Sequence, residues 1–330
     1  MQTRPGPSLF GGTPLSAFEE EEVLARILPL FPLAEGLLVP PGDDAAVLAT
    51  GEKTIATTDT VVLGRDWVDE WSSGADIGHK VVVQNLADVA AMGGRPTGVL
   101  LTLVADPGIS LEWVLDHARG VAEACREAGV GVLGGDLSSA PAGVLMVSVT
   151  ALGDLQGEAV LRSGARPGHV LAVHGSLGLA AAGLHLLQAG TPERHPEAVG
   201  RQRRPRTPLR AGIEAATVGA SAMLDISDGL LRDGGRIARA SKVVIDLDPA
   251  AIAADVAALV EAVGETVARD CVLAGGEEHS LLATFPPGRM PVGWRALGSV
   301  REPSAGESPR ILVGGRAMSH TGWDHFHAET

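Results

Sequence analysis

Segments with strand and helix patterns alternate along this chain, and this alternation constrains its fold more than any other feature. In the first half, apolar segments at 98–104, 130–133 and 143–153 are typical of buried strands, and residues 110–128 have the spacing of an amphipathic helix. A second series of such segments begins near residue 169. Alternating strands and helices pack as layers of sheet and helix, so the sequence predicts an α/β fold with α+β layers.

The alternation stops between Leu155 and Gly168, where Gly, Arg and Pro accumulate. A chain of 330 residues is also longer than one ordinary domain of roughly 100–200 residues. We therefore predict an N-terminal domain over residues 16–154 and a C-terminal α/β domain over residues 155–330. Residues 1–15 are rich in Gly, Pro, Ser and Thr and are predicted to be disordered.

Capping signals mark two of the predicted helices. Ser16 and Glu19 have the spacing of a capping box at the start of a helix over residues 17–30. Asp76 is placed to cap a helix that ends at the Gly93-Gly94 pair. Further helices are predicted to end near residue 189 and to cover 110–128, 208–219, 228–240 and 249–263, with strands at 46–49, 54–58, 98–104, 130–133, 143–153, 169–173, 222–225, 243–247, 280–285 and 310–313.

Composition excludes several classes of protein. The formal net charge is −14, whereas a surface that binds nucleic acid needs an excess of Lys and Arg to neutralise phosphates. The one basic cluster, at 201–210, is interrupted by prolines and is predicted to be part of a loop over 190–210. No apolar run approaches the ~20 residues that span a bilayer, and no signal peptide is evident. We therefore expect a cytoplasmic protein with neither nucleic-acid nor membrane partners.

The interior must be built from aliphatic side chains, because there is no Tyr and aromatic residues make up only 3% of the chain. The 43 glycines supply turns and close approach between backbones. Cys125 and Cys271 lie in apolar contexts without CxxC spacing. They are expected to be buried structural residues in a reducing compartment.

Two common nucleotide-binding motifs are not present in working form. The sequence GVGVLG at 129–134 has GxGxxG spacing, but it follows a helix pattern and is itself an apolar strand, whereas the dinucleotide fingerprint opens a helix. Residues 51–54 resemble the end of a Walker A loop but lack its upstream glycine and its adjacent Gly-Lys pair. The histidines show no zinc-type spacing. Any nucleotide must therefore be held by other groups.

Aspartates recur at strand ends and in glycine-rich turns. The segments are GDDAA at 42–46, TTDT at 57–60, NLAD at 85–88, GGD at 134–136 and DISDG at 225–229. Asp88 falls in an otherwise apolar helical turn, where burial of an unpaired carboxylate would cost several kcal/mol. A break from strand to helix at Ser227 would bring Asp225 and Asp228 together and point backbone N–H groups at an anion.

Carboxylates gathered without lysines must take up protons or bind cations. Oxygen ligands of this kind suit Mg²⁺, which bridges carboxylates to phosphates. Several Mg²⁺ ions that clamp a polyphosphate are a physical solution for a protein without a P-loop lysine. The residues alone therefore predict a magnesium-dependent enzyme that uses ATP.

The ordered motifs resemble those of one enzyme family. They are GDDAAV, TTDT, QNLADVAAMGG, GGDLSS, LRSGARPG, MLDISDGLLRD, AGGEEHSLL and GWDHF, and they extend from residue 42 to residue 326. The set is similar to that of the thiamine-monophosphate kinases, which are related to the aminoimidazole ribonucleotide synthetases and the selenophosphate synthetases. The resemblance implies two α/β domains with ATP bound between them and a homodimer paired through the N-terminal domain. It also implies direct transfer of the ATP γ-phosphoryl group to thiamine monophosphate.

The resemblance further implies roles for individual residues. The Mg²⁺ ligands would be Asp44, Thr58, Asp59, Asp88, Asp136, Asp225 and Asp228. Asp136 and Asp228 are also the expected catalytic residues. The residues in contact with ATP would be Gly135, Asp136, Arg162 and Ser227. The thiamine end of the substrate would contact Asp66, Glu278 and Trp323, the last by stacking on the cationic rings.

Two departures from the family pattern affect the substrate side. Residues 64–67 are Gly-Arg-Asp-Trp where the family usually has Gly-Val-His-Phe, so Asp66 replaces a His that contacts substrate. Residues 275–279 are Gly-Gly-Glu-Glu-His where the family has Gly-Gly-Glu-Asp-Tyr. Two alternatives therefore stay open. One is another ATP-using enzyme of the same larger group, and the other is a metal-stabilised binding protein that senses thiamine phosphates.

Overall fold

The computed structural model folds as two compact units. The residues that it describes are 6–42, 45–319 and 322. Unit 1 contains Met1–Val89 and Arg95–Gln156, and unit 2 contains Ala90–Gly94 and Gly157–Thr330. Both units combine helices with a β-sheet, which confirms the predicted α/β class. The sequence places the domain boundary after residue 154, and the chain passes from unit 1 to unit 2 after Gln156.

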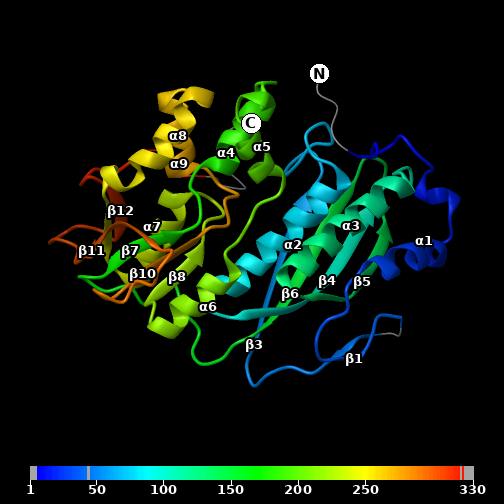
Figure 1. Ribbon diagram of the computed structural model, residues 1–330, viewed down its shortest axis with the longest axis horizontal. Helices are drawn as coiled ribbons and strands as arrows, with labels where there is room; N and C mark the ends of the chain where they lie inside the picture. The colour runs from blue at the N-terminus through cyan, green and yellow to red at the C-terminus, as the bar shows by residue number, and fades with distance from the viewer. Residues whose placement is uncertain (1–5, 43–44, 320–321, 323–330) are drawn as a thin grey trace. The chain divides into compact units, whose positions relative to one another are not determined.

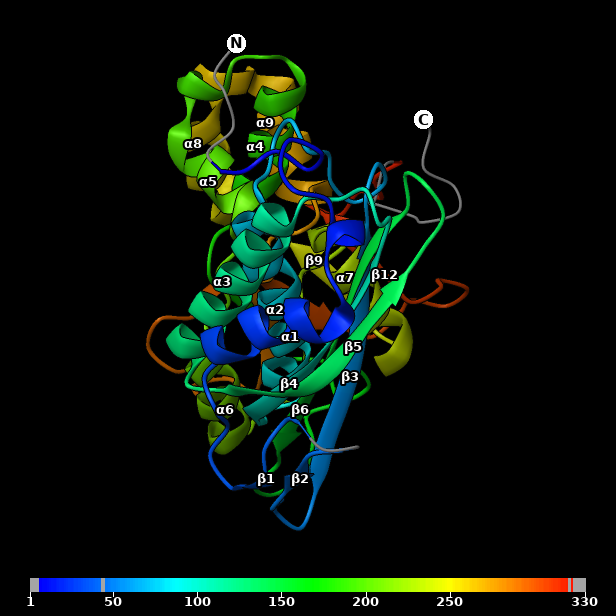
Figure 2. The ribbon, with the colours of Figure 1, turned by 90° about the vertical axis from the view of Figure 1, so that its right-hand side faces the viewer.

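Unit 1 is built on a four-stranded sheet of order β3-β6-β4-β5, in which only the β4–β5 pair is parallel. Figures 1 and 2 show α2 and α3 side by side on one face of this sheet. The elements are α1 (Glu20–Ile27), β1 (Leu37–Val39), β2 (Val47–Leu48), β3 (Thr54–Val62), α2 (Gly74–Ala91), β4 (Arg95–Ala105), α3 (Leu111–Ala128), β5 (Gly131–Ser139) and β6 (Leu145–Asp154).

Glycines allow α2 and α3 to touch backbone to backbone. A Cβ atom on Gly78 would lie 2.2 Å from the carbonyl oxygen of His117, and one on Gly120 would lie 2.0 Å from that of Ala75. Neither position can hold a larger residue without separating the helices, since real Cβ atoms do not approach other atoms this closely. The two glycines therefore fix how α2 lies on the sheet.

The N-terminal segment differs from its prediction. Residues 8–15 are held against the start of α3: Leu9 is buried, the amide of Ser110 donates to its carbonyl, and the amide of Leu15 donates to Ile109. The prediction of disorder is therefore wrong for these residues, because composition does not reveal the hydrogen bonds that hold them. Residues 1–5 lie outside the described residues.

Both predicted capping assignments shift by one turn. The capping box of α1 is formed by Glu19 and Glu22, whereas Ser16 lies in a short 3₁₀ turn before the helix. At α2, the hydroxyl of Ser73 accepts from the amide of Asp76 and the carboxylate of Asp76 accepts from the amide of Ser73. Asp76 is thus the acidic third residue of a capping box that starts at Ser73.

Unit 2 contains a six-stranded sheet of order β12-β9-β11-β7-β10-β8. Neighbouring strands are antiparallel except β12 and β9. The elements are β7 (Val170–His174), α4 (Leu179–Gln188), α5 (Pro196–Arg203), α6 (Leu209–Val218), β8 (Ala222–Asp225), α7 (Leu230–Ser241), β9 (Val244–Leu247), α8 (Ala253–Val263), α9 (Glu265–Ala274), β10 (Leu281–Phe285), β11 (Arg295–Arg301) and β12 (Arg310–Val313).

Two apolar cores lie on opposite faces of this sheet, because successive strand residues point to opposite sides. Leu171 and Val173 of β7 belong to a core shared with α4, α7, α8 and α9, whereas Ala172 belongs to a core shared with α6. In unit 2 the sequence misses α5, α9 and β11. The apolar content of α5 is low, and β11 has an Arg at each end, so neither has a strong periodic pattern.

The two cysteines are buried, as predicted, and desolvation raises the thiol pKa of Cys125 to about 12 and that of Cys271 to about 11. Neither is therefore a thiolate near neutral pH. In the part of the chain that the structure describes, no helix combines the length and the apolarity needed to cross a membrane.

The buried ring of His117 predicts a pH-dependent stability. It is 1% exposed, stacks on Trp113 at 5.5 Å, and burial lowers its pKa from 6.5 to about 4. The unfolded chain therefore takes up a proton below pH 6.5 that the folded chain refuses until about pH 4. Stability from this residue is present above pH 6.5 and is lost as the pH falls, by up to roughly 3 kcal/mol.

Urea unfolding at pH 7.5 and pH 4.5 measures this effect in the wild type and in His117→Phe, which keeps a stacked ring that cannot titrate. We expect a smaller loss of unfolding free energy on acidification in the variant. Equal losses in the two proteins would contradict the assignment.

Candidate active site

The helix-covered face of the unit 1 sheet brings Asp59 and Asp88 to the same side. In β6, Gly153 faces α2, because a Cβ on it would lie 2.4 Å from the side chain of Val89. Thr57 and Asp59 of β3 pair with the buried residues Ala151 and Val149, which share that face by strand alternation. The hydroxyl of Thr57 donates to Oδ2 of Asp88 at 2.7 Å.

Thr57 is therefore a site residue that the sequence analysis missed. The hydroxyl of Thr57 orients the carboxylate of Asp88. The family resemblance instead assigns a role to its neighbour, Thr58. Side chains two residues apart in a strand share a face, so Thr57 lies on the same face as Asp59. This alternation could have identified Thr57 from the sequence.

The side chain of Thr58 lies on the other face. Its hydroxyl accepts from Thr150 at 3.1 Å and donates to the carbonyl of Val149 at 3.0 Å. Thr58, which the resemblance names among the Mg²⁺ ligands, thus lies on the face opposite Asp59, because neighbouring strand residues point to opposite faces.

Asp136 also lies on the face away from α2. It pairs with Thr102 in β4, which in turn pairs with Ser148 in β6, and Ser148 alternates with the buried, helix-facing residues of that strand. Asp136 is exposed, and the hydroxyl of Ser138 donates to its Oδ2 at 2.7 Å. Before it, Gly135 packs so closely on β4 that a Cβ would lie 1.8 Å from the carbonyl oxygen of Leu101. Only glycine fits at that position.

In unit 2, Asp225 ends β8 and Asp228 lies in the turn before α7, so the predicted break from strand to helix is confirmed. Each carboxylate has a basic partner. Oδ2 of Asp225 lies 3.0 Å from Nδ1 of His279, and Oδ2 of Asp228 pairs closely with Arg236. Nε of Arg232 lies 3.8 Å from the same oxygen of Asp228.

The backbone amides of this turn already have an acceptor. The amides of Ser227, Asp228 and Gly229 donate to Oδ2 of Asp233 at 3.1, 2.9 and 3.1 Å. These N–H groups therefore point at a carboxyl group, as the sequence predicts, but that group is a side chain of α7 and not a ligand. Burial, followed by the charge of Asp225, raises the pKa of Asp233 to about 7.

A strained loop lies beside this turn. Glu277 and His279 have positive φ angles of 59° and 52°, a conformation that non-glycine residues rarely adopt and that often marks functional sites. The amide of Glu277 donates to the carbonyl of Ser227, and that of His279 donates to Ile226. Gln202 of α5 donates to Oε2 of Glu277 at 2.6 Å, so the segment predicted as a basic loop is partly helical and supports the site.

Glu278 is 1% exposed and its carboxylate serves the interior of unit 2. The hydroxyl of Ser176 and the amide of Ala180, in the first turn of α4, both donate to it. A negative charge is favourable at a helix N-terminus. Both oxygens therefore have partners inside the unit, which indicates a structural role, while the contact between Glu278 and substrate stays a prediction.

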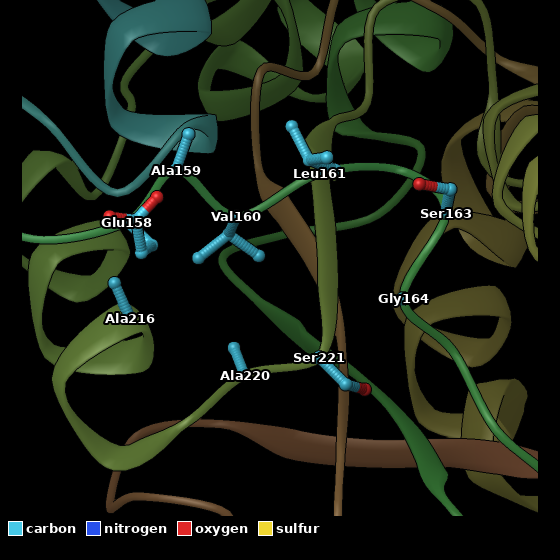
Figure 3. Close-up of a pocket in the computed structure, with 9 residues that line it drawn as sticks. All are labelled: Glu158, Ala159, Val160, Leu161, Ser163, Gly164, Ala216, Ala220 and Ser221. Carbon is cyan, nitrogen blue, oxygen red and sulfur yellow. The ribbon is translucent and has the colours of Figure 1, made fainter.

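The remaining predicted residues are placed as follows. Oδ2 of Asp66 accepts from the amide of Val62 at 2.8 Å and closes the turn after β3, while the carboxyl group stays half-exposed. Arg162 is exposed, and its neighbours Leu161 and Ser163 line a cavity of about 430 Å³ beside the end of α6 (Figure 3). Asp44 and Trp323 lie outside the described residues.

The donor set of unit 1 fits a hard cation in kind, since it consists of carboxylate and hydroxyl oxygens from Asp59, Asp88 and Thr57. Among the described residues, no three His, Cys, Asp or Glu side chains converge in an arrangement that could hold a metal ion. The predicted ligands are instead distributed over both faces of one sheet and over both units.

Comparisons with known proteins agree with the motif order. Residues 42–155 match the family described as AIR synthase related protein, N-terminal domain, and residues 166–292 match the corresponding C-terminal domain. The chain is 43% identical to the thiamine-monophosphate kinase of Mycobacterium tuberculosis. The alignment extends over 295 residues and covers 88% of this chain and 86% of the relative.

Solved structures give the same result. The thiamine-monophosphate kinase of Stenotrophomonas maltophilia superposes with a TM-score of 0.77 at 30% identity, covering 90% of this chain and 96% of its own. AaThiL complexed with AMPPCP and TMP superposes with a TM-score of 0.76 at 29% identity, and the match covers 86% of this chain and 91% of that one. The family predicted from the motifs is confirmed: this chain belongs to the thiamine-monophosphate kinases, within the AIR synthase related proteins.

Proposed function

We propose that this protein transfers the γ-phosphoryl group of ATP to thiamine monophosphate and so forms thiamine diphosphate. The observation that carries this proposal is the 43% identity, over 88% of the chain, to a thiamine-monophosphate kinase. The similarity to a solved complex with TMP and AMPPCP, an analogue of ATP, supports both substrates.

The nucleophile in this reaction is an oxygen of the substrate phosphate, which is already anionic. No residue has to remove a proton from it, so the chain must position the two phosphates in line and offset their charge. We propose that the aspartates hold Mg²⁺ for this purpose, with Thr57 in place of Thr58 as the hydroxyl that orients them. The proposed ligands are Asp44, Asp59, Asp88, Asp136, Asp225 and Asp228. Bound Mg²⁺ would supply the positive charge that the phosphates require.

We propose that the residues that the family resemblance assigns to ATP also contact ATP in this chain. Arg162 has an exposed guanidinium group, whose fork suits phosphate oxygens. Ser227 is assigned through its hydroxyl, since its amide donates to Asp233. Asp136 and the preceding Gly135 complete this group. At the thiamine end, the half-exposed carboxylate of Asp66 would attract the thiazolium charge and Trp323 would stack on the rings.

We further propose that the enzyme is a homodimer that pairs through unit 1. Within that unit, the sheet face opposite α2 carries exposed or half-exposed side chains on both outer and inner strands, among them Val62 and Leu100. Apolar residues on a sheet face are typical of an interface, and two identical faces can pair about a two-fold axis. The use of ATP and the two free, buried cysteines support a cytoplasmic location.

Incubation of the protein with ATP, Mg²⁺ and thiamine monophosphate, followed by chromatographic detection of thiamine diphosphate, tests the function. Binding of thiamine monophosphate without formation of the product would identify the protein as a sensor. Formation of ADP only with a different acceptor would indicate another enzyme of the same larger group.

Asp136→Asn and Asp228→Asn each remove a negative charge that would hold Mg²⁺ beside the transferred phosphoryl group. We expect turnover to fall by roughly 100-fold or more in each, since such electrostatic contacts contribute most in the transition state. Circular dichroism should be unchanged. Asp270→Asn, on the exposed side of α9, is the matched control and should retain full turnover. Full turnover in both site variants would refute the assignment.

Glu278→Gln tests the reassignment of this residue. The amide keeps one acceptor but loses the charge at the start of α4 and presents a donor to another donor, so the free energy of unfolding should fall by about 1–3 kcal/mol. The KM for thiamine monophosphate should stay within about twofold, because the carboxylate is buried away from solvent. A large rise in KM at unchanged stability would restore Glu278 as a substrate contact.

A further inference from the structure

Asp233, the last residue of the MLDISDGLLRD motif, has no role assigned by the family resemblance, yet it organises the turn around Asp228. Oδ2 of Asp233, at the fourth position of α7, accepts from three consecutive backbone amides within 3.1 Å. The amide of Asp233 itself donates to the carbonyl of Gly229 at 2.9 Å. The side chain therefore folds back over the start of its own helix and fixes the backbone of residues 227–229.

The second oxygen of Asp233 connects this turn to the side chain of Asp228. Oδ1 pairs with one terminal nitrogen of Arg236, and the other terminal nitrogen pairs with Oδ2 of Asp228. The planar guanidinium fork can hold two carboxylates at a fixed separation, which a single ammonium group cannot do. Backbone and side chain of Asp228 are thus both tied to Asp233, the side chain through Arg236.

Burial shows that this link is more than a surface ion pair. The side chain of Asp233 is 1% exposed, that of Asp228 15% and that of Arg236 30%. Exposure thus increases outward from Asp233 and leaves Asp228 partly accessible to a ligand. The turn cannot relax easily, because a Cβ on Gly229 would lie 2.5 Å from the carbonyl oxygen of Ala274.

A simple helix cap would not have this form. A capping side chain accepts hydrogen bonds from amides at the start of a helix and needs no further partner. Asp233 does so with one oxygen and uses the other to direct Arg236 toward Asp228, the proposed cation ligand. A further carboxylate placed near Asp225 and Asp228 also adds like charge, which would be unfavourable if its purpose were stability alone.

We propose that Asp233 is a positioning residue for phosphoryl transfer. It holds the turn of residues 227–229 and, through Arg236, sets the orientation in which the carboxylate of Asp228 receives a divalent cation. This inference rests on the proposed function, since it takes Asp228 as a cation ligand.

The test measures cation binding directly, on the full-length protein, by titration with Mn²⁺ alone and detection of the free ion by electron paramagnetic resonance. Asp233→Asn keeps the shape but removes the charge that directs Arg236. We expect its apparent Kd for Mn²⁺ to rise by about tenfold or more, as for residues that orient metal ligands, and its half-saturating Mg²⁺ in the kinase assay to rise in parallel. Arg236→Lys should change both in the same direction.

Asp255→Asn is the matched control. Asp255 is another partly buried carboxylate of unit 2 paired with an arginine, Arg295, on different elements. The Asp255→Asn protein should be less stable than the wild type and should bind Mn²⁺ with the same affinity. A lower melting temperature for Asp233→Asn with unchanged Mn²⁺ affinity and unchanged Mg²⁺ dependence would reduce Asp233 to a helix cap and overturn the proposal.

Two further outcomes are distinguishable. If Asp233→Asn does not fold, Arg236→Lys decides, because it leaves the amide contacts of Asp233 in place, and wild-type Mn²⁺ affinity in that variant would overturn the proposal. If the wild type binds Mn²⁺ but forms no thiamine diphosphate, the proposed function fails, while the role of Asp233 in orienting Asp228 is still judged by the Mn²⁺ titration.

Discussion

Each carboxylate in the turn between β8 and α7 needs a partner, and this need organises that part of unit 2. A carboxylate removed from water is stable only beside hydrogen-bond donors or a cation. Asp225 has His279, Asp228 has Arg236, and Asp233 has three backbone amides. These contacts share one short turn, so its conformation is set by the folded chain alone. A site that is already ordered loses less entropy when it binds a ligand.

Backbone contact between helices performs the corresponding task in unit 1. Gly78 and Gly120 let α2 and α3 touch, and this contact determines how α2 lies on the sheet. Asp88 is thereby held where the hydroxyl of Thr57 reaches it. In both units the acidic residue is oriented by a neighbour to which the family resemblance assigns no role.

The sequence predicted the class of fold and the family because these depend on patterns with a fixed period and order. It failed where the position of a residue depends on a single backbone dihedral angle or on the face of the sheet to which its side chain points. Thr57 and Thr58 are adjacent and chemically identical, and only the pairing of β3 with β6 distinguishes them. Asp233 was passed over because three of its partners are backbone amides, which carry no sequence signal. The left-handed backbone of Glu277 has no sequence signal, since glycine would be expected there.

The departures from the family pattern have different weights once their surroundings are known. Glu278 and His279 both point into unit 2, at 1% and 5% exposure. The extra methylene of Glu lengthens the reach toward α4, and the imidazole of His279 brings a nitrogen to Asp225. Both changes therefore act inside unit 2, where they adapt the support of a strained loop.

Asp66 is different, because it is a half-buried residue in the turn after β3, and its Oδ2 accepts from Val62 and closes that turn. A carboxylate there carries a full negative charge, whereas the His of the family is neutral or positive near neutral pH. The exchange favours a cationic ligand and disfavours an anionic one. Thiamine monophosphate carries both charges, so Asp66 can contribute to its binding only at the thiazolium end, away from the phosphate that receives the transferred group.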